Sequence, residues 1–232
     1  MRVLVTRPEH DAERTAERLM ALGHEAVIDS LLRIEPAAFG AVQGIFQALA
    51  ITSANAVRAS GKEKLAPFLP LPLFAVGESS AEAARLAGFS RVIVCEGDAH
   101  ALAKALAENL PAHSRVLYLA GADRAQDLAA LVAAAEIEIE TKVVYRAVPV
   151  TQLAKETLVR MQEGEIDAVL HYSRRSAETF LALVRKGSNG GTAGSILHIC
   201  LSDAVAAPLL QAGFDVKVAA HPNEDALFAL LD

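Results

Sequence analysis

Short apolar runs alternate with longer segments of helical period along the whole chain. Residues 2–6 predict a strand, and the segment from Pro8 to Leu22 predicts a helix that Gly23 ends. The alternation continues, with further strands predicted at residues 25–29, 48–52, 73–76, 91–94, 116–119, 168–171, 198–201 and 215–219. Buried strands that alternate with helices of roughly 10–15 residues indicate βαβ units and parallel pairing. The predicted fold class is therefore α/β.

One part of this pattern occurs twice. Residues 75–106 align without a gap on residues 200–231, at a constant offset of 125, and both copies carry Ala-Gly-Phe at the same place. Asp98 and Asn223 stand near corresponding helix starts, where such side chains cap a helix. A shorter echo places Thr52-Ser53 on Tyr172-Ser173, although any two βαβ units could share so short a match. The longer match predicts two similar lobes.

Two extended stretches, residues 31–36 and 142–149, flank the first copy of the repeat and lack helical periodicity. If they pair as linker strands, residues 37–141 form one lobe, and residues 1–33 join residues 149–232 in the other. The linker strands are then residues 34–36 and 142–148. A single division near Pro149 is the alternative. The N-terminal strand–helix–strand unit is too small to bury its own faces, which favours the discontinuous division.

Composition and charge narrow the classes of function. The 232 residues are 53% hydrophobic and 22% charged, which excludes intrinsic disorder. The formal net charge of −6 gives no overall attraction for nucleic acid or for an anionic membrane surface, so local groups must hold any anionic ligand. No apolar segment approaches the roughly 18–20 residues of a membrane span, and the first run is too short for a signal peptide, so we expect a cytoplasmic protein. Cys95 and Cys200 lack the spacing of metal ligands, and neither a metal site nor a disulfide is predicted.

Candidate binding residues follow the predicted strands. In an open parallel sheet, ligands bind beyond the carboxyl ends of the strands, where helices begin. These turns supply the candidate residues Thr6, Arg7, Thr52, Ser53, Ala54, Gly77, Glu78, Ser79, Gly121, Arg124, Ser173, Arg174 and Ser202. Small hydroxyl residues at such places also cap helices, and capping alone explains most of them. Free N–H groups at helix starts attract anions as well, so two lobes facing one cleft predict a large ligand with several negative groups.

Familiar catalytic motifs are absent. The chain has no glycine-rich loop of the nucleoside-triphosphate type, no dinucleotide fingerprint after the first strand and no Gly-x-Ser-x-Gly. The histidines are scattered, and His171 and His198, which end or begin strands, are expected to be structural.

Several short motifs occur in a characteristic order along the chain. They are Val-Leu-Val-Thr-Arg-Pro at 3–8, Ile-Thr-Ser-Ala-Asn-Ala-Val at 51–57, Phe-Ala-Val-Gly-Glu-Ser-Ser at 74–80, Val-Val-Tyr-Arg at 143–146 and Pro-Asn-Glu-Asp-Ala-Leu at 222–227. None is distinctive alone, but their order and spacing across almost the whole chain resemble those of bacterial uroporphyrinogen-III synthases. The resemblance implies two flavodoxin-like α/β lobes with parallel sheets, joined by a two-stranded linker.

The resemblance also implies an activity. It is the cyclisation of hydroxymethylbilane, a linear tetrapyrrole rich in carboxylates, to uroporphyrinogen III, with loss of water, inversion of ring D and no cofactor. Tyr145 of the Val-Tyr motif is the family's candidate for assisting departure of the ring A hydroxyl. A phenol of pKa ~10 is a weak acid, so we expect it to orient or hydrogen-bond the leaving group. We expect a monomer, with room for a transient contact with the preceding pathway enzyme.

This chain departs from the family at one turn. Many members have Gly-x-Thr/Ser-Thr where it has Ser202-Asp203-Ala204-Val205, which places more weight on backbone donors and on Ser202 itself. Two other functions stay open from the residues alone. One is a two-lobe cytosolic binding or sensory protein that closes on a small polyacid without chemistry. The other is a two-lobe transferase, against which the missing nucleotide loop counts.

Overall fold

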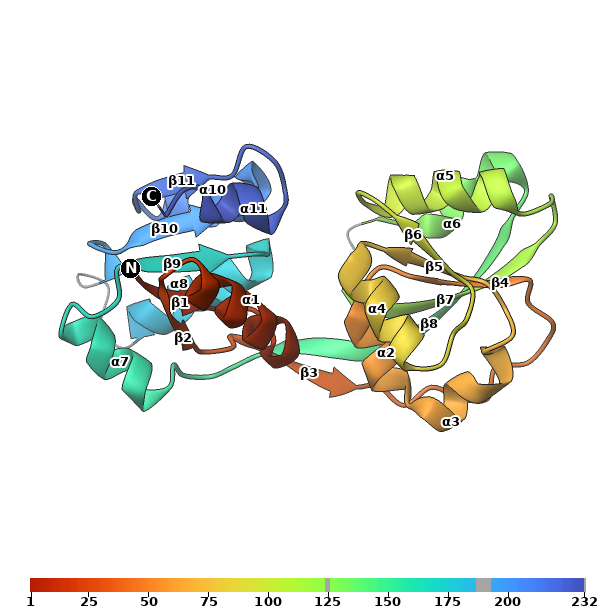
Figure 1. The fold of residues 1–232 in the computed structure, drawn as a ribbon, viewed down its shortest axis with the longest axis horizontal. Helices are drawn as coiled ribbons and strands as arrows, with labels where there is room; N and C mark the ends of the chain where they lie inside the picture. Colours follow the sequence, from red (N-terminus) through yellow and green to blue (C-terminus); the bar gives the residue numbers. More distant parts are fainter. Residues whose placement is uncertain (124–125, 187–192, 232) are drawn as a thin grey trace. The chain divides into compact units, whose positions relative to one another are not determined.

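The computed structural model describes residues 1–123, 126–186 and 193–231. The chain divides into two compact units, one formed by Met1–Arg33 with Val148–Asp232 and the other by Ile34–Ala147. We call these the first and the second unit. Each has its own sheet with helices on both faces (Figure 1).

The first unit is built on a five-stranded sheet. Its strands, in spatial order, are β2 (Glu25–Ile28), β1 (Arg2–Val5), β9 (Ala168–His171), β10 (Leu197–Cys200) and β11 (Val216–Val218). All neighbours pair in parallel, and in chain order this is 2-1-3-4-5, the flavodoxin-like order. Its helices are α1 (Glu9–Ala21), α7 (Lys155–Gln162), α8 (Arg174–Lys186), α10 (Asp203–Gln211) and α11 (Glu224–Phe228).

Alternate residues of these strands feed two cores. Leu4 and Val169 pack with α7, α8 and α10 on one face of the sheet, and Val3 and Val5 pack with α1 and α11 on the other. All four side chains are fully buried, which is why the strands read as continuous apolar runs.

The second unit has a six-stranded sheet. Its strands, in spatial order, are β3 (Leu32–Pro36), β8 (Glu138–Pro149), β7 (Arg115–Gly121), β4 (Ala48–Ile51), β5 (Leu73–Val76) and β6 (Val92–Cys95). Its helices are α2 (Ala54–Ser60), α3 (Lys62–Leu65), α4 (Glu78–Leu86), α5 (Ala99–Asn109) and α6 (Leu128–Val132), with the 3₁₀ turns η1 (Ala66–Phe68) and η2 (Ala133–Ala135). Helices α2 and α4 cover one face and α5 and α6 the other. Without β3, the strands of the second unit have the same spatial arrangement as those of the first, with β8 and β7 in the places of β2 and β1. The two units differ in chain order, because β7 and β8 are the last strands of the second unit, whereas β1 and β2 are the first strands of the first unit.

The predicted repeat is confirmed as a structural repeat. Helix α4 spans residues 78–86 and α10 spans 203–211, so the offset of 125 holds at both ends. Asp98 caps α5 by accepting from the N–H groups of His100 and Ala101, and Asn223 caps α11 by accepting from that of Ala226. Gly88 and Gly213, at corresponding helix ends, both have positive φ, which explains why each copy carries glycine there.

The structure extends one predicted element. The stretch at 142–149 is the second half of a longer strand, since β8 begins at Glu138 and pairs with β7 from Arg115. Its first residues alternate charged and apolar side chains without a buried run, so the sequence pattern does not reveal them. β3 and β8 are sheet neighbours, with Ala37 N–H donating to Val144 O at 2.8 Å. Their service as a linker stays a prediction.

Among the described residues, every helix is too short or too polar to cross a membrane.

Candidate active site

Parallel pairing brings the predicted turns of the second unit to one edge of its sheet. Ile51, at the end of β4, pairs with Ala75 of β5 and with Leu119 of β7. The turns after these strands begin at Thr52, Gly77 and Ala122, and Gly121 is the last residue of β7. They therefore share the carboxyl edge of the sheet, where ligands bind in this topology.

Tyr145 lies against Gly121 at this edge. The register pairs Ala120 with Val143 and Gly121 with Tyr145, so a bulge passes over Val144. Val144 is fully buried in the core, and Tyr145 is left beside the end of β7. A Cβ added to Gly121 would come within 2.7 Å of Tyr145 Cζ and 2.9 Å of its hydroxyl oxygen. Only glycine lets the ring rest on the backbone here, which joins two predicted site residues in one contact.

The turn after β4 is held from inside the unit. The hydroxyls of Thr52 and Tyr118 lie 3.0 Å apart, and Tyr118 is buried on the neighbouring strand β7. Ser53 caps α2 by accepting from Asn55 N–H at 3.2 Å. Ala54 is buried in the core, so this residue can offer a ligand only its backbone.

The turn after β5 is set by glycine. Gly77 has φ +73° and precedes α4, and its N–H donates to Cys95 O at 3.0 Å. Glu78 is exposed and forms an ion pair with Arg85 along the same helix, while Ser79 is half-buried at the start of α4. The negative charge of Glu78 does not favour a carboxylate ligand, so the backbone is the better donor at this turn. Arg124, the remaining candidate of this unit, lies outside the described residues.

In the first unit, two candidate side chains are used internally. Thr6 is fully buried, and its hydroxyl donates to Leu170 O at 2.7 Å, which ties β1 to β9. Any contact of Thr6 with a ligand is therefore confined to its backbone. Arg7 donates to Glu224 Oε1 at 2.9 Å and stacks over the Tyr172 ring at 4.3 Å, so its charge is already engaged.

The turns that open α8 and α10 differ. Ser173 and Ser176 form a reciprocal cap, in which Ser176 N–H donates to Ser173 Oγ at 3.1 Å. Arg174 is exposed and donates to Glu178 at 2.8 Å on the next turn of α8. Ser202 precedes α10, but its side chain makes no cap hydrogen bond to this helix. Unlike the hydroxyl of Ser173 at the start of α8, the Ser202 hydroxyl does not cap the helix that follows it.

Glu224 is a further candidate residue, which its sequence neighbourhood does not single out. Its carboxylate is mostly buried, and burial would raise its pKa, but hydrogen bonds from Thr15 and Tyr172 and the charges of Arg7 and Arg18 outweigh burial and lower the pKa. The motif at 222–227 contained this residue, but only the fold shows what its carboxylate contacts.

The two predicted structural histidines lie in the first unit's core. His171 and His198 are fully buried, with His171 Nε2 3.0 Å from His198 Nδ1. Burial lowers the pKa of both rings. They hold the core together as a neutral pair and take no part in the candidate site.

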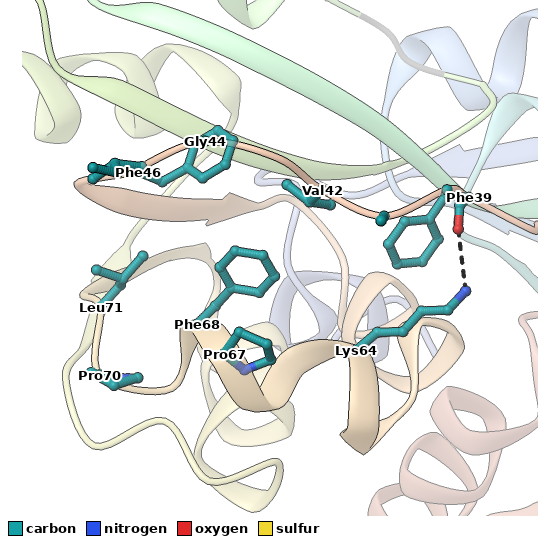
Figure 2. A pocket seen from close by; sticks show the side chains of 12 residues that line it. Phe39, Val42, Gly44, Phe46, Lys64, Pro67, Phe68, Pro70 and Leu71 are labelled. Carbon is teal, nitrogen blue, oxygen red and sulfur yellow. Dashed lines mark hydrogen bonds between the residues drawn. The ribbon is translucent and has the colours of Figure 1, made fainter.

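A hollow of about 500 Å³ lies elsewhere in the second unit (Figure 2). Phe46, Phe68 and Leu71 line it, just before β4 and β5 begin, so it sits at the opposite edge from the candidate site. Lys64 reaches across it, with Nζ 3.4 Å from Phe39 O and 4.1 Å from the centre of that ring. An apolar hollow with a single lysine is a poor match for a ligand with many carboxylates.

Comparisons with known proteins agree with this architecture. The family model described as uroporphyrinogen-III synthase HemD matches residues 13–229. No curated protein sequence matches the chain. Among solved structures, the uroporphyrinogen-III synthetase from Helicobacter pylori 26695 is 19% identical, with 100% of this chain and 98% of that one covered and a TM-score of 0.67. A mutant uroporphyrinogen III synthase from the extremely thermophilic bacterium Thermus thermophilus is 16% identical, with 100% and 97% covered and a TM-score of 0.50. The structural likeness shows a common fold, and because the family model spans nearly the whole sequence, the chain belongs to the uroporphyrinogen-III synthase family.

Proposed function

We propose that the chain closes hydroxymethylbilane to uroporphyrinogen III, with loss of water and inversion of ring D, and that Tyr145 lies beside the departing ring A hydroxyl. The family match supports the activity. The observation that carries the site is the Tyr145 ring seated on Gly121, at the carboxyl edge of the sheet.

The chemistry asks more for orientation than for strong acid or base. Departure of the ring A hydroxyl leaves an electrophilic azafulvene, and ring D attacks it through its substituted carbon to form a spiro intermediate that rearranges. A phenol can donate a hydrogen bond to the leaving oxygen and hold it in line without giving up its proton. Holding rings A and D in contact supplies much of the remaining rate enhancement, because bound geometry replaces a chance encounter.

The substrate's carboxylates have suitable partners in each unit. The starts of α2, α4, α8 and α10 present backbone N–H groups at the carboxyl edges of the two sheets. Such donors hold carboxylates without adding net positive charge, which fits a chain of formal charge −6. Ser202 adds a hydroxyl that its own helix does not use.

We also propose the setting of this reaction. The enzyme acts in the cytoplasm as a monomer without a cofactor, and contacts the enzyme that supplies its substrate only transiently. The acidic balance of the chain supports a free small-molecule substrate over nucleic acid or a membrane surface.

The Tyr145→Phe variant tests the proposed site. It keeps the ring on Gly121 and removes only the hydroxyl, so the protein should remain folded. We expect kcat for formation of uroporphyrinogen III to fall about 10–100-fold, because the variant loses one hydrogen bond to an oxygen that becomes charged as it departs, worth roughly 1.5–3 kcal/mol. A variant with wild-type kcat would remove Tyr145 from the mechanism.

The alternative, a binding or sensory protein for a polyacid, gives a different result. Such a protein binds hydroxymethylbilane without speeding its consumption, and the product is then only the isomer I that forms spontaneously.

A further inference from the structure

One carboxylate in the first unit gathers a cluster of polar side chains from three other parts of the chain. Glu224 Oε1 accepts hydrogen bonds from Arg7 Nη1 at 2.9 Å, from Thr15 Oγ1 at 2.6 Å and from the Tyr172 hydroxyl at 2.7 Å. Its other oxygen, Oε2, accepts from Arg18. We call these residues the Glu224 cluster.

The cluster connects turns that are far apart in sequence. Arg7 follows β1, Tyr172 follows β9 and immediately precedes Ser173, and Glu224 opens α11 after β11. Thr15 and Arg18 lie on α1. The Glu224 side chain is 13% exposed, so its hydrogen bonds compete little with water.

The charges of the cluster are nearly balanced. Arg7 also faces Asp11 at 3.6 Å, and Arg18 also pairs with Asp225. Two guanidinium groups therefore meet three carboxylates, and little positive charge is left to attract an anionic substrate. Such a network fixes geometry more than it supplies charge.

We propose that Glu224 is a positioning residue of the synthase reaction, whose carboxylate holds the turns after β1 and β9 in the geometry that receives the substrate. This inference rests on the proposed function, because it assumes that Arg7, Ser173 and the backbone around them contact substrate. Glu224 itself need not touch the tetrapyrrole. It sets the shape of the first unit's share of the site.

The test compares Glu224→Gln with Glu25→Gln in the purified full-length enzyme. Glu25 is a matched control, since it is a glutamate of the same unit paired with Arg160 at 2.6 Å, but it opens β2 at the amino edge of the sheet. We expect the KM for hydroxymethylbilane to rise about tenfold in Glu224→Gln with kcat within about twofold, a loss of ~1.4 kcal/mol in binding. Glu25→Gln should leave both constants unchanged.

A second variant guards against misfolding. Tyr172→Phe keeps every charge and removes one hydrogen bond to Glu224, so it should also raise KM, and its effect should be less than additive with that of Glu224→Gln. A KM that stays constant while the melting temperature falls would make Glu224 merely structural and overturn the proposal. A KM that falls in Glu224→Gln would overturn it too, because freed arginine charge, and not position, would then control binding.

Failure of the proposed function looks different. In that case the wild-type enzyme itself forms no uroporphyrinogen III.

Discussion

Replacing Gly121 with alanine probes the contact on which the candidate site depends. The added Cβ would lie 2.7 Å from Tyr145 Cζ, closer than the 3.0 Å below which real Cβ contacts essentially do not occur. The obstructing atoms belong to the far end of the tyrosine, so the ring must swing away while the backbone of β7 and β8 stays paired.

This substitution should have two effects of different size, a small loss of stability and a large loss of catalytic rate. Moving one partly buried ring costs stability at the low end of overpacking, about 1 kcal/mol. That corresponds to a fall in melting temperature of roughly 2–4 °C. A catalytic hydroxyl displaced by about 1 Å can cost on the order of 10²-fold in rate. We therefore expect Gly121→Ala to remain folded and to lose most of its kcat/KM.

Thermal unfolding followed by circular dichroism and steady-state formation of uroporphyrinogen III measure the two effects. Gly40→Ala is the control, because its added Cβ meets nothing within 4 Å and it lies in the same unit. In a Tyr145→Ala background, Gly121→Ala should cost little stability, since the ring is gone. The reasoning is refuted by an equal cost in both backgrounds, or by unchanged kcat/KM in Gly121→Ala alone.

Three further predictions concern the first unit. Burial lowers the pKa of His171 and His198, so the unfolded chain binds more protons than the folded protein as the pH falls. The free energy of unfolding is therefore at its full value above about pH 6.5 and falls as the pH decreases below it. A urea midpoint that stays constant from about pH 7.5 to 5.5 contradicts this prediction. Thr6→Val should cost about 1–2 kcal/mol of unfolding free energy, because it removes the hydroxyl's hydrogen bond to the Leu170 carbonyl, yet keep KM unchanged, and a raised KM would return the hydroxyl to the site. Ser202→Ala should leave stability within about 0.5 kcal/mol and raise KM severalfold, and an unaltered KM would show that this hydroxyl does not meet substrate.

The strands and the repeat could be predicted because strands that are buried on both faces consist of continuous runs of apolar residues. Strands β5 and β9 begin and end at the predicted residues, 73–76 and 168–171 respectively. The repeat was readable for a related reason, since a cap and a positive-φ glycine recur at fixed distances in both copies. Local signals of this kind depend only on neighbours in the sequence.

The remaining features depend on contacts between distant residues. Nothing near Thr6 indicates that its hydroxyl would reach Leu170, and nothing near Glu224 indicates that four donors from other elements would surround it. The bulge that seats Tyr145 on Gly121 is likewise a matter of register between two strands. Most turns of the candidate site could therefore be predicted from the sequence. Which of their side chains already form hydrogen bonds or ion pairs within the protein could not.

The most direct measurement is the isomer ratio of the porphyrin made from hydroxymethylbilane. The purified protein is incubated with this linear tetrapyrrole, the products are oxidised, and the uroporphyrin isomers are separated by chromatography. Our account predicts isomer III as the main product, at a rate proportional to enzyme concentration. Isomer I alone, formed at the rate seen without protein, would contradict it.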